Sequence, residues 1–357
     1  MGKREETKAS LIRHCEKYPK LRIRDLFKYV YQSSFGCEHL ISCPEAAEDY
    51  IRKEAEQYAG KAEEAVEPLD GEYCRVHLDY VKDGLFAGTL AKLFWLSAGH
   101  VEDGRERLLE KLSVLLEAAE EGVLPFERKE VETELECWRE AGYPACHHSE
   151  EFRSAYAPAY RLIKKEYASF LPLFQRIDSL LREGRVTLAI EGGSASGKST
   201  LGKLLARVYD CTVFHMDDFF LRPEQRTKER FAEPGGNVDR ERFLEEVLLP
   251  LHRRKTVAYR RFDCSTLTLE EPVLVKPSKL TVIEGAYSMH PELAKYYDLS
   301  VFLEVSSETQ RKRIEKRNTP ELAKRFHEEW IPMEQRYFSE LKVKERCEIL
   351  CKTEAVM

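Results

Sequence analysis

A glycine-rich stretch in the middle of the chain has residue types and spacing suited to binding phosphate groups. From Gly192 to Ser199 the sequence matches G-x-x-x-x-G-K-[ST], after the apolar run Val186–Ile190 and before the helical pattern Leu201–Val208. Glycines allow a tight turn whose backbone N–H groups approach an anion. The following helix would add unpaired N–H donors and the positive end of its dipole. The pattern therefore predicts a loop that binds a nucleoside triphosphate.

The side chains within this stretch suggest two tasks. Lys198 would supply a positive charge for the β- and γ-phosphates, and the Ser199 hydroxyl could ligate Mg²⁺. We expect the nucleotide to contact the whole loop, which consists of Gly192, Gly193, Ser194, Ala195, Ser196, Gly197, Lys198, Ser199 and Thr200.

Carboxylates follow two further candidate strands. Asp217 and Asp218 come directly after the run Cys211–His215, and Glu284 follows Val282 and Ile283. Ligands of parallel sheets bind beyond the carboxyl ends of the strands. One aspartate is therefore suited to orienting a hydroxyl and accepting its proton, which we assign to Asp217, while Asp218 could help to hold Mg²⁺. Glu284 is placed as a Walker B acid near the metal; for the aspartates a helix N-cap is the alternative.

A basic segment near the C-terminus could cover the phosphate loop. The predicted helix Ser307–Arg317 carries Arg311, Arg313 and Arg317. Arginine offers planar donors to phosphate oxygens, so this helix could close over the transferring group and exclude water. A solvated basic face is the alternative.

Two segments and two arginines could line the pocket for an acceptor. Phe231–Asp239 is a glycine- and proline-rich stretch, and Tyr259–Thr266 mixes aromatic, basic and hydroxyl groups. Arg222 and Arg226 stand close to the aspartate pair in the sequence. These groups would provide a polar substrate site.

The residues from about 183 onward alternate between strand and helix patterns. The expected strands are Val186–Ile190, Cys211–His215, Lys279–Ile283 and Leu299–Val305, with a small hairpin from Thr256–Phe262 and Pro272–Val275. Alternation of this kind predicts an α/β domain whose parallel sheet is covered by helices, at residues 183–357.

Residues 1–182 have mostly helical spacing and give no comparable signature. Tyr156, Tyr160, Ile163 and Tyr167 fall at helical intervals, so we expect a packing stripe there. Cys146, His147 and His148 could form a polar pocket or a metal site with Cys37, Glu38, His39 and Cys43, although ordinary hydrogen bonding by the histidines is the simpler interpretation. We expect a mainly α-helical domain of unknown role.

Composition argues against several classes of protein. The 357 residues have a formal net charge of −6, which argues against nucleic-acid binding by bulk electrostatics. No apolar run approaches the roughly 20 residues that span a bilayer, and the polar start predicts a cytoplasmic protein. The ten cysteines form no C-x-x-C pair and are expected to be free thiols. We therefore expect neither membrane nor nucleic-acid partners; the oligomeric state is left open.

The motifs together resemble the phosphoribulokinase and uridine kinase family of P-loop kinases. The resemblance covers about residues 185–338, a little under half of the chain, through Gly192–Thr200, Met216–Phe220, Pro234–Asp239, Ile283–Gly285 and the Arg311–Arg317 helix. It implies ATP and Mg²⁺ as cofactors and a small hydroxylated metabolite as acceptor. It also implies catalytic roles for Lys198, for Asp217 as base, and for Arg313 and Arg317 as lid arginines, less directly for Arg311.

The resemblance leaves the acceptor open. Nucleosides such as uridine fit it best, but the Arg261–Thr266 segment has Phe262 where uridine kinases have a tyrosine, and no histidine follows. Nicotinamide riboside kinases and pantothenate kinases are similar at the same motifs. A switch driven by nucleotide hydrolysis is a different alternative, but no residue is evident that would position water. A separate activity of the N-terminal domain is a third.

Overall fold

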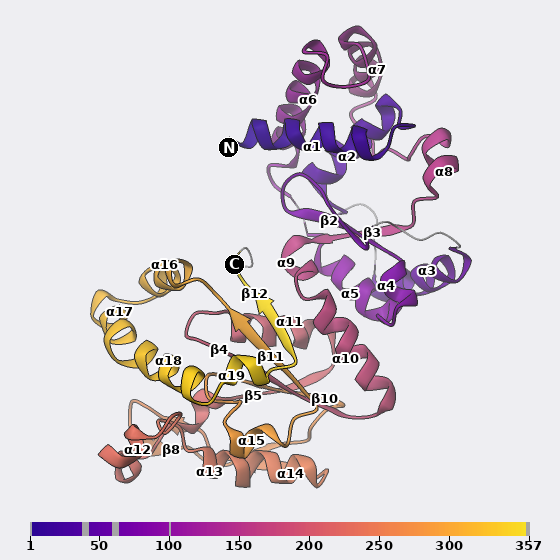
Figure 1. The fold of residues 1–357 in the computed structure, drawn as a ribbon. Helices are drawn as coiled ribbons and strands as arrows, with labels where there is room; N and C mark the ends of the chain where they lie inside the picture. Colours follow the sequence, from indigo (N-terminus) through magenta and orange to yellow (C-terminus); the bar gives the residue numbers. More distant parts are fainter. Residues whose placement is uncertain (1, 38–42, 59–63, 100, 355–357) are drawn as a thin grey trace. The chain divides into compact units, whose positions relative to one another are not determined.

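The computed structural model of the protein (Figure 1) describes residues 2–37, 43–58, 64–99 and 101–354. These residues form two compact units, Met1–Ala168 and Ser169–Met357. The sequence patterns suggested a division near residue 182, whereas here the helix α10 (Leu171–Glu183) belongs to the second unit. The hydroxyl of Tyr209 donates to a carboxylate oxygen of Asp178 at 2.7 Å, which ties α10 to that unit.

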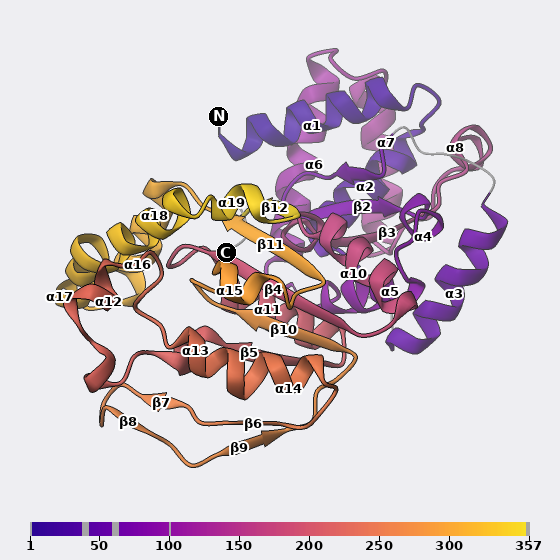
Figure 2. The ribbon, with the colours of Figure 1, turned by 60° about the horizontal axis from the view of Figure 1, so that its bottom comes forward.

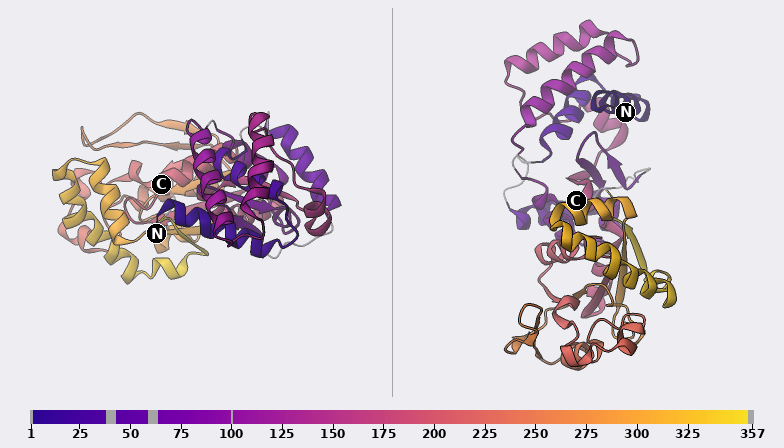
Figure 3. Two further views of the ribbon diagram at one scale, coloured as in Figure 1. Left: turned by 90° about the horizontal axis from the view of Figure 1, so that it is seen from above. Right: turned by 90° about the vertical axis from the view of Figure 1, so that its left-hand side faces the viewer.

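The first unit combines helices with a small antiparallel sheet. Figure 3 shows the long helices α6 and α7 side by side, and the sheet order is β1-β2-β3. Its elements are α1 Lys3–Lys17, α2 Ile23–Phe35, α3 Pro44–Gln57, β1 Val66–Pro68, β2 Tyr73–His77, α4 Asp79–Lys82, α5 Ala87–Leu96, α6 Gly104–Glu120, α7 Arg128–Glu140, α8 Glu150–Tyr156, β3 Tyr160–Lys164 and α9 Lys165–Ala168.

The expected helical stripe through Tyr156, Tyr160, Ile163 and Tyr167 is wrong. Residues 160–164 form strand β3, in which Tyr160 pairs with His77 and Ile163 pairs with Cys74 of β2. Every residue of β2 is buried, and in β3 the adjacent residues Leu162 and Ile163 are buried, so burial does not alternate along either strand as it does in a half-exposed sheet. Pairing of residues 160–164 with β2, which is distant in sequence, has outweighed the helical spacing of the aromatic residues.

The second unit is built on a five-stranded parallel sheet of order β12-β11-β4-β10-β5 (Figure 2). Its strands are β4 Val186–Gly192, β5 Cys211–His215, β10 Leu280–Glu284, β11 Leu299–Glu304 and β12 Ile349–Lys352. The four strands expected from the sequence are confirmed to within two residues. The short edge strand β12 was not expected.

Helices pack on this sheet and extend past its edge. They are α10, α11 Lys198–Val208, α12 Lys228–Ala232, α13 Arg240–Phe243, α14 Leu249–His252, α15 Pro291–Ala294, α16 Ser307–Arg317, α17 Pro320–Arg325, α18 Ile331–Glu340 and α19 Val343–Arg346. Single π-helical turns join α13 to α14 and α17 to α18. The helical stretches 240–252 and 320–340 thus each contain one turn of π-helix.

A two-part hairpin arm stands beside the main sheet. Strand β6 (Val257–Tyr259) pairs with β9 (Val273–Val275), and within them β7 (Phe262–Asp263) pairs with β8 (Thr268–Leu269). The expected hairpin is therefore confirmed, and Figure 2 shows its four strands as one extended arm.

An aromatic cluster anchors the arm to the core. The Phe219 ring lies 4.9 Å from the Phe243 ring and 5.7 Å from the Tyr259 ring, all three side chains being buried. Phe219 ends the 3₁₀ turn that follows β5. The core thus fixes the turn that carries the aspartate pair.

None of the helices in the described part of the chain combines the length and apolar character that crossing a bilayer would require.

Candidate active site at the carboxyl ends of the strands

The predicted phosphate loop connects β4 to α11 as expected. Gly192 has φ +149° and Gly197 has φ +101°, in the region that favours glycine. A Cβ atom on Gly192 would stand 2.7 Å from the Leu303 carbonyl oxygen and 2.7 Å from the Ser196 hydroxyl. The tight turn therefore depends on glycine at this position.

Lys198 begins α11 and its ammonium group bends back over the loop. Its Nζ donates to the carbonyl oxygens of Gly192 and Gly193, each at 2.9 Å. The Ser196 hydroxyl is buried and has no hydrogen-bond partner among the described residues. A donor left unpaired inside a glycine-rich loop suits a loop that receives an anion.

Ser199 and Glu284 meet as the motifs predicted. The Ser199 hydroxyl donates to Oε1 of Glu284 at 3.0 Å, from the first turn of α11 to the end of β10. The imidazole of His215, which ends β5, hydrogen-bonds the same oxygen. Parallel pairing brings this about, since Glu284 lies opposite His215 in register.

The pKa shifts of His215 and Glu284 favour an ion pair between the two side chains. The hydrogen bond to Glu284 raises the pKa of His215 despite partial burial. Burial acts to raise the pKa of Glu284, but the contacts with His215 and the charge of Lys198 outweigh it and lower that pKa. The carboxylate is thus kept ionised beside the Ser199 hydroxyl. Nothing in the motif analysis pointed to His215.

A serine hydroxyl beside an ionised carboxylate fits Mg²⁺. The ion usually keeps several waters and takes one or two protein ligands together with substrate phosphates. Ser199 could bind it directly and Glu284 directly or through water. Among the described residues no group of three or more histidine, cysteine, aspartate or glutamate side chains is placed to hold a metal by itself.

The two aspartates after β5 have different surroundings. Asp217 is exposed, yet the protein around it raises the pKa of its carboxyl by desolvation; Glu284 acts in the same direction, and Lys198 acts against it. Asp218 instead pairs with Arg261 of the hairpin arm at 3.5 Å. The charges that act on Asp217 are thus those of the phosphate-loop lysine and of Glu284, whereas Asp218 forms an ion pair with the arm. A metal-binding part for Asp218 stays a prediction.

The two lid arginines also differ. Arg313 donates to the carbonyl oxygens of Ala195 at 3.1 Å and Thr353 at 2.6 Å, so it braces the phosphate loop. Arg317 lies over the ring of Phe326 at 5.5 Å. Its positive charge works against the net rise in the pKa of Asp217. Arg311 is exposed. Arg317 is thus better placed than Arg313 to act on a group beside Asp217.

Two buried glutamates that the sequence motifs did not indicate lie next to the phosphate loop. Glu334 of α18 accepts from the Ser194 amide at 2.9 Å and from the Ser194 hydroxyl at 2.7 Å. Glu191, the residue before Gly192, accepts from the Met289 amide at 2.9 Å and the Tyr337 hydroxyl at 3.0 Å. Burial raises the pKa of Glu334 and raises that of Glu191 to about 7. Glu334 is 140 residues from Ser194 in sequence, so no local pattern could have revealed it.

The expected acceptor segments form a folded frame. Arg230 holds the Phe231–Asp239 stretch by donating to the carbonyl oxygens of Gly236 at 3.0 Å and Val238 at 2.9 Å. Arg226 lies over the Phe262 ring at 5.7 Å, and Arg222 approaches Asp239 at 3.8 Å. Asp239 also caps α13 by accepting from the Arg242 amide, so its first role is structural.

The Cys146–His148 stretch of the first unit is engaged in hydrogen bonds. Lys28 and Arg24 donate to the carbonyl oxygens of Cys146 and His147, and His148 bonds Asp25 and Tyr160. This agrees with the simpler interpretation of ordinary hydrogen bonding. Of the suggested metal partners, Glu38 and His39 lie outside the described residues.

Comparison with known proteins gives a partial picture. No family model matches the chain, and no curated protein matches it. Among solved structures, a possible uridine kinase from Bacillus stearothermophilus is 23% identical, with a TM-score of 0.38, over 50% of this chain and 99% of that one. Shikimate kinase from Aquifex aeolicus is 21% identical, with a TM-score of 0.24, over 47% and 86%.

These likenesses are too low to argue for a function. The fold itself follows from the parallel sheet, the helices on it and the glycine-rich loop after β4, which together give the α/β P-loop kinase fold that the sequence predicted. The activity has to be argued from the site.

Proposed function

We propose that the protein is an ATP-dependent phosphotransferase that moves the γ-phosphate onto a hydroxyl group of a small metabolite, with a nucleoside as the first candidate. One observation supports this above the others. Lys198 lies over the glycine-rich loop, Ser199 hydrogen-bonds Glu284 at 3.0 Å, and the exposed Asp217 follows the strand whose last residue, His215, pairs with Glu284. A carboxylate so placed can meet an incoming hydroxyl.

The residues divide the work of phosphoryl transfer. The loop amides and Lys198 would hold the β- and γ-phosphates. Mg²⁺, when bound through Ser199 and Glu284, would neutralise charge on the phosphate oxygens. Asp217 would orient the acceptor hydroxyl and take its proton late in the transfer. Arg317 would offset charge that develops on the transferring group.

The state of Asp217 is suited to this task. Desolvation raises the pKa of its carboxyl above the ordinary value of 3.8, so the carboxylate binds a proton more readily than a solvated one. Positive charge from Lys198 still favours its ionised form. A raised pKa of this kind is typical of groups that accept protons during catalysis.

The arm and the 231–239 stretch support a small acceptor rather than a macromolecule. Arg261 connects the arm to Asp218, and Arg226 stacks on Phe262, so charged and aromatic groups stand close to the aspartate pair. Such groups could bind the ring and hydroxyls of a nucleoside, or the polar chain of pantothenate. Nicotinamide riboside would use the same features.

The test is ATP turnover in the presence and absence of a panel of acceptors. The panel would include uridine, cytidine, adenosine, nicotinamide riboside and pantothenate, with Lys198→Ala as the inactive control. We expect ADP formation to be nearly absent without acceptor and to rise at least a hundredfold with one panel member. Steady hydrolysis that no acceptor stimulates would instead support a nucleotide-driven switch and refute the proposal.

A further inference from the structure

The first unit contains a pocket that the proposed phosphotransfer does not use. Its volume is about 160 Å³, roughly ten times the ~15 Å³ needed for one water molecule. Side chains from β2 and β3 line it, as do residues from the ends of α1 and α8; the lining includes Tyr18, Tyr58, Arg75, Phe152, Tyr156 and Tyr160. Half of its lining residues are tyrosine or phenylalanine, and aromatic side chains are common in the lining of ligand pockets.

Aromatic rings form a continuous wall of this pocket. The Tyr18 ring lies 4.9 Å from both the Phe152 and the Tyr156 ring, and those two rings are 4.8 Å apart. The Tyr160 ring comes from β3, with the Arg75 guanidinium 4.7 Å above it. Phe152 is itself stacked on His148 at 4.1 Å, so the rings left for a planar ligand are the partly exposed ones of Tyr18, Tyr58 and Tyr156.

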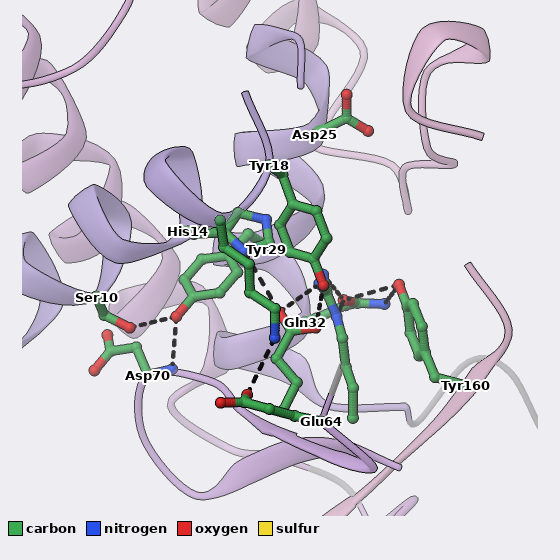
Figure 4. A network of polar contacts seen from close by, with 12 residues as sticks. Ser10, His14, Tyr18, Asp25, Tyr29, Gln32, Glu64, Asp70 and Tyr160 are labelled. Atoms are coloured by element: carbon green, nitrogen blue, oxygen red, sulfur yellow. Dashed lines mark hydrogen bonds and ion pairs between the residues drawn. The ribbon is translucent and has the colours of Figure 1, made fainter. Parts of the chain in front are cut away.

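The polar side of the pocket is a buried hydrogen-bond network, seen in Figure 4. Arg75 is 1% exposed and donates to Gln32 at 2.8 Å and to Glu67 at 3.1 Å. The Tyr18 hydroxyl donates to the same glutamate at 2.7 Å. Burying so many polar groups lowers stability unless all are paired, so a network of this size is a candidate for a selected function.

Hydrogen bonding with His148 holds Tyr160 in place. His148 contacts the Tyr160 hydroxyl through Nε2 at 2.7 Å and Asp25 through Nδ1 at 3.0 Å. Burial lowers the pKa of His148 to about 4, so its neutral ring donates to Asp25 and accepts from Tyr160. The hydroxyl of Tyr160 is therefore committed to the network, and the Arg75 guanidinium lies against its ring.

Charges in and around the pocket are balanced. Arg75 is paired with Glu67 at 3.1 Å, and Lys17 with Glu64 at 3.1 Å. An added ionic group would lack a counter-charge and would lose its hydration on entry. A neutral ligand with both donors and acceptors suits the site better than an anion or a cation.

We propose that this pocket binds a small, uncharged, planar ring compound of nucleobase size that carries hydrogen-bond donors and acceptors. The inference uses only residues of the first unit and does not rest on the proposed phosphotransfer.

Calorimetric titration of the full-length protein tests it with neutral and anionic probes matched in ring type. The pairs are uracil with orotate and nicotinamide with nicotinate. We expect at least one neutral probe to bind with a Kd below ~1 mM and its carboxylate partner to bind at least tenfold more weakly. Failure of both neutral probes to bind, or tighter binding of the carboxylates, would overturn the proposal.

Variants locate the binding. Tyr156→Ala and, as a second pocket variant, Tyr58→Ala should each weaken binding about tenfold through loss of a stacking face. Tyr50→Ala, which removes a 72% exposed tyrosine from α3 of the same unit, should leave it unchanged. Asp217→Asn should also leave it unchanged. Binding that responds to Asp217→Asn but to neither pocket variant would assign the probe to the second unit and refute the inference.

Discussion

At the scale of single residues, the contrast between Asp217 and Asp218 is the sharpest feature of the proposed active site. The two are adjacent in sequence, yet the electrostatic partners of Asp217 are the phosphate-loop lysine and Glu284, whereas Asp218 pairs with Arg261. Adjacent carboxylates repel, so division of their roles is physically reasonable. The division leads to different expectations for two isosteric substitutions.

Asp217→Asn should lower kcat by about 10²–10⁴-fold, because a positioned proton acceptor contributes about that much. ATP affinity should stay within a few-fold of the parent value. Asp218→Asn is the matched control and should cost far less in kcat. Steady-state kinetics with the best acceptor, together with nucleotide titration, measures both. Equal losses in the two variants would contradict the assignment.

The pH dependence of the parent enzyme provides a second test of the same carboxylate. Asp217 must be ionised to accept a proton, so kcat/KM should fall as pH drops through its pKa. Because that pKa is raised, the fall should come above the 3.8 of an ordinary aspartate. A pH–rate profile should show this acid limb in the parent, and the residual activity of Asp217→Asn should lack it.

Glu191 predicts a stability effect rather than a kinetic one. Its pKa is about 7 in the fold and 4.5 in the unfolded chain, so the folded state binds the extra proton between these values. The contribution of Glu191 to the free energy of unfolding should therefore be fully present below pH 4.5. It should be lost, by on the order of 3 kcal/mol, as the pH rises through 7.

Glu191→Gln should remove this fall in the free energy of unfolding between pH 4.5 and 7, because glutamine does not titrate. Thermal unfolding at pH 5 and pH 8 should show a smaller decrease in Tm for the variant than for the parent protein. The Gln side chain keeps an oxygen to accept from Met289 and Tyr337, so the variant is expected to fold. A parent and variant with equal pH dependence would show that Glu191 is ionised throughout.

At the scale of elements, helix α16 carries two arginines with separable effects. Arg313 braces the loop through two carbonyl oxygens, so Arg313→Ala should lower Tm as well as activity. Arg317 is exposed, so Arg317→Ala should leave Tm within about 1 °C and lower kcat. Thermal unfolding and kinetics on both variants test this. A Tm loss confined to Arg317→Ala would reverse the two roles.

Elements with strong local signals could be predicted from the sequence. The strand, glycine turn and helix around Gly192 are fixed by neighbouring residues, and α11 ends at Val208 as the helical pattern indicated. Strand β3 was expected to be helical because its partners in β2 lie far away in sequence, as with Ile163 and Cys74, which are both buried. Strand β12 has only four residues, too few for a pattern.

The site could be predicted in its parts but not in its pairings. Lys198, Ser199 and Glu284 were identified because the loop and strand-end positions are local features. The attachment of Glu334 to Ser194 depends on tertiary packing, as does the pairing of Arg261 with Asp218. Contacts of this kind between residues distant in sequence leave no local pattern that a single sequence could show.

At the scale of the whole molecule, two compact units bear distinct sets of polar residues. The second has a glycine-rich loop, a hydrogen-bonded pair formed by Ser199 and Glu284, and an exposed aspartate, Asp217. The first has an aromatic pocket backed by Arg75 and Glu67. Each can be tested with the full chain, because Lys198→Ala and Tyr156→Ala change one unit at a time.

The central claim is that the γ-phosphate goes to a hydroxyl rather than to water. The most direct measurement follows ATP labelled at the γ-phosphate through complete turnover with Mg²⁺ and the acceptor that best stimulates ADP formation. The account predicts one labelled phosphoester for each ADP, with inorganic phosphate at the level of the Lys198→Ala control. Label recovered as inorganic phosphate in equal amount to ADP, with no phosphoester, would contradict it.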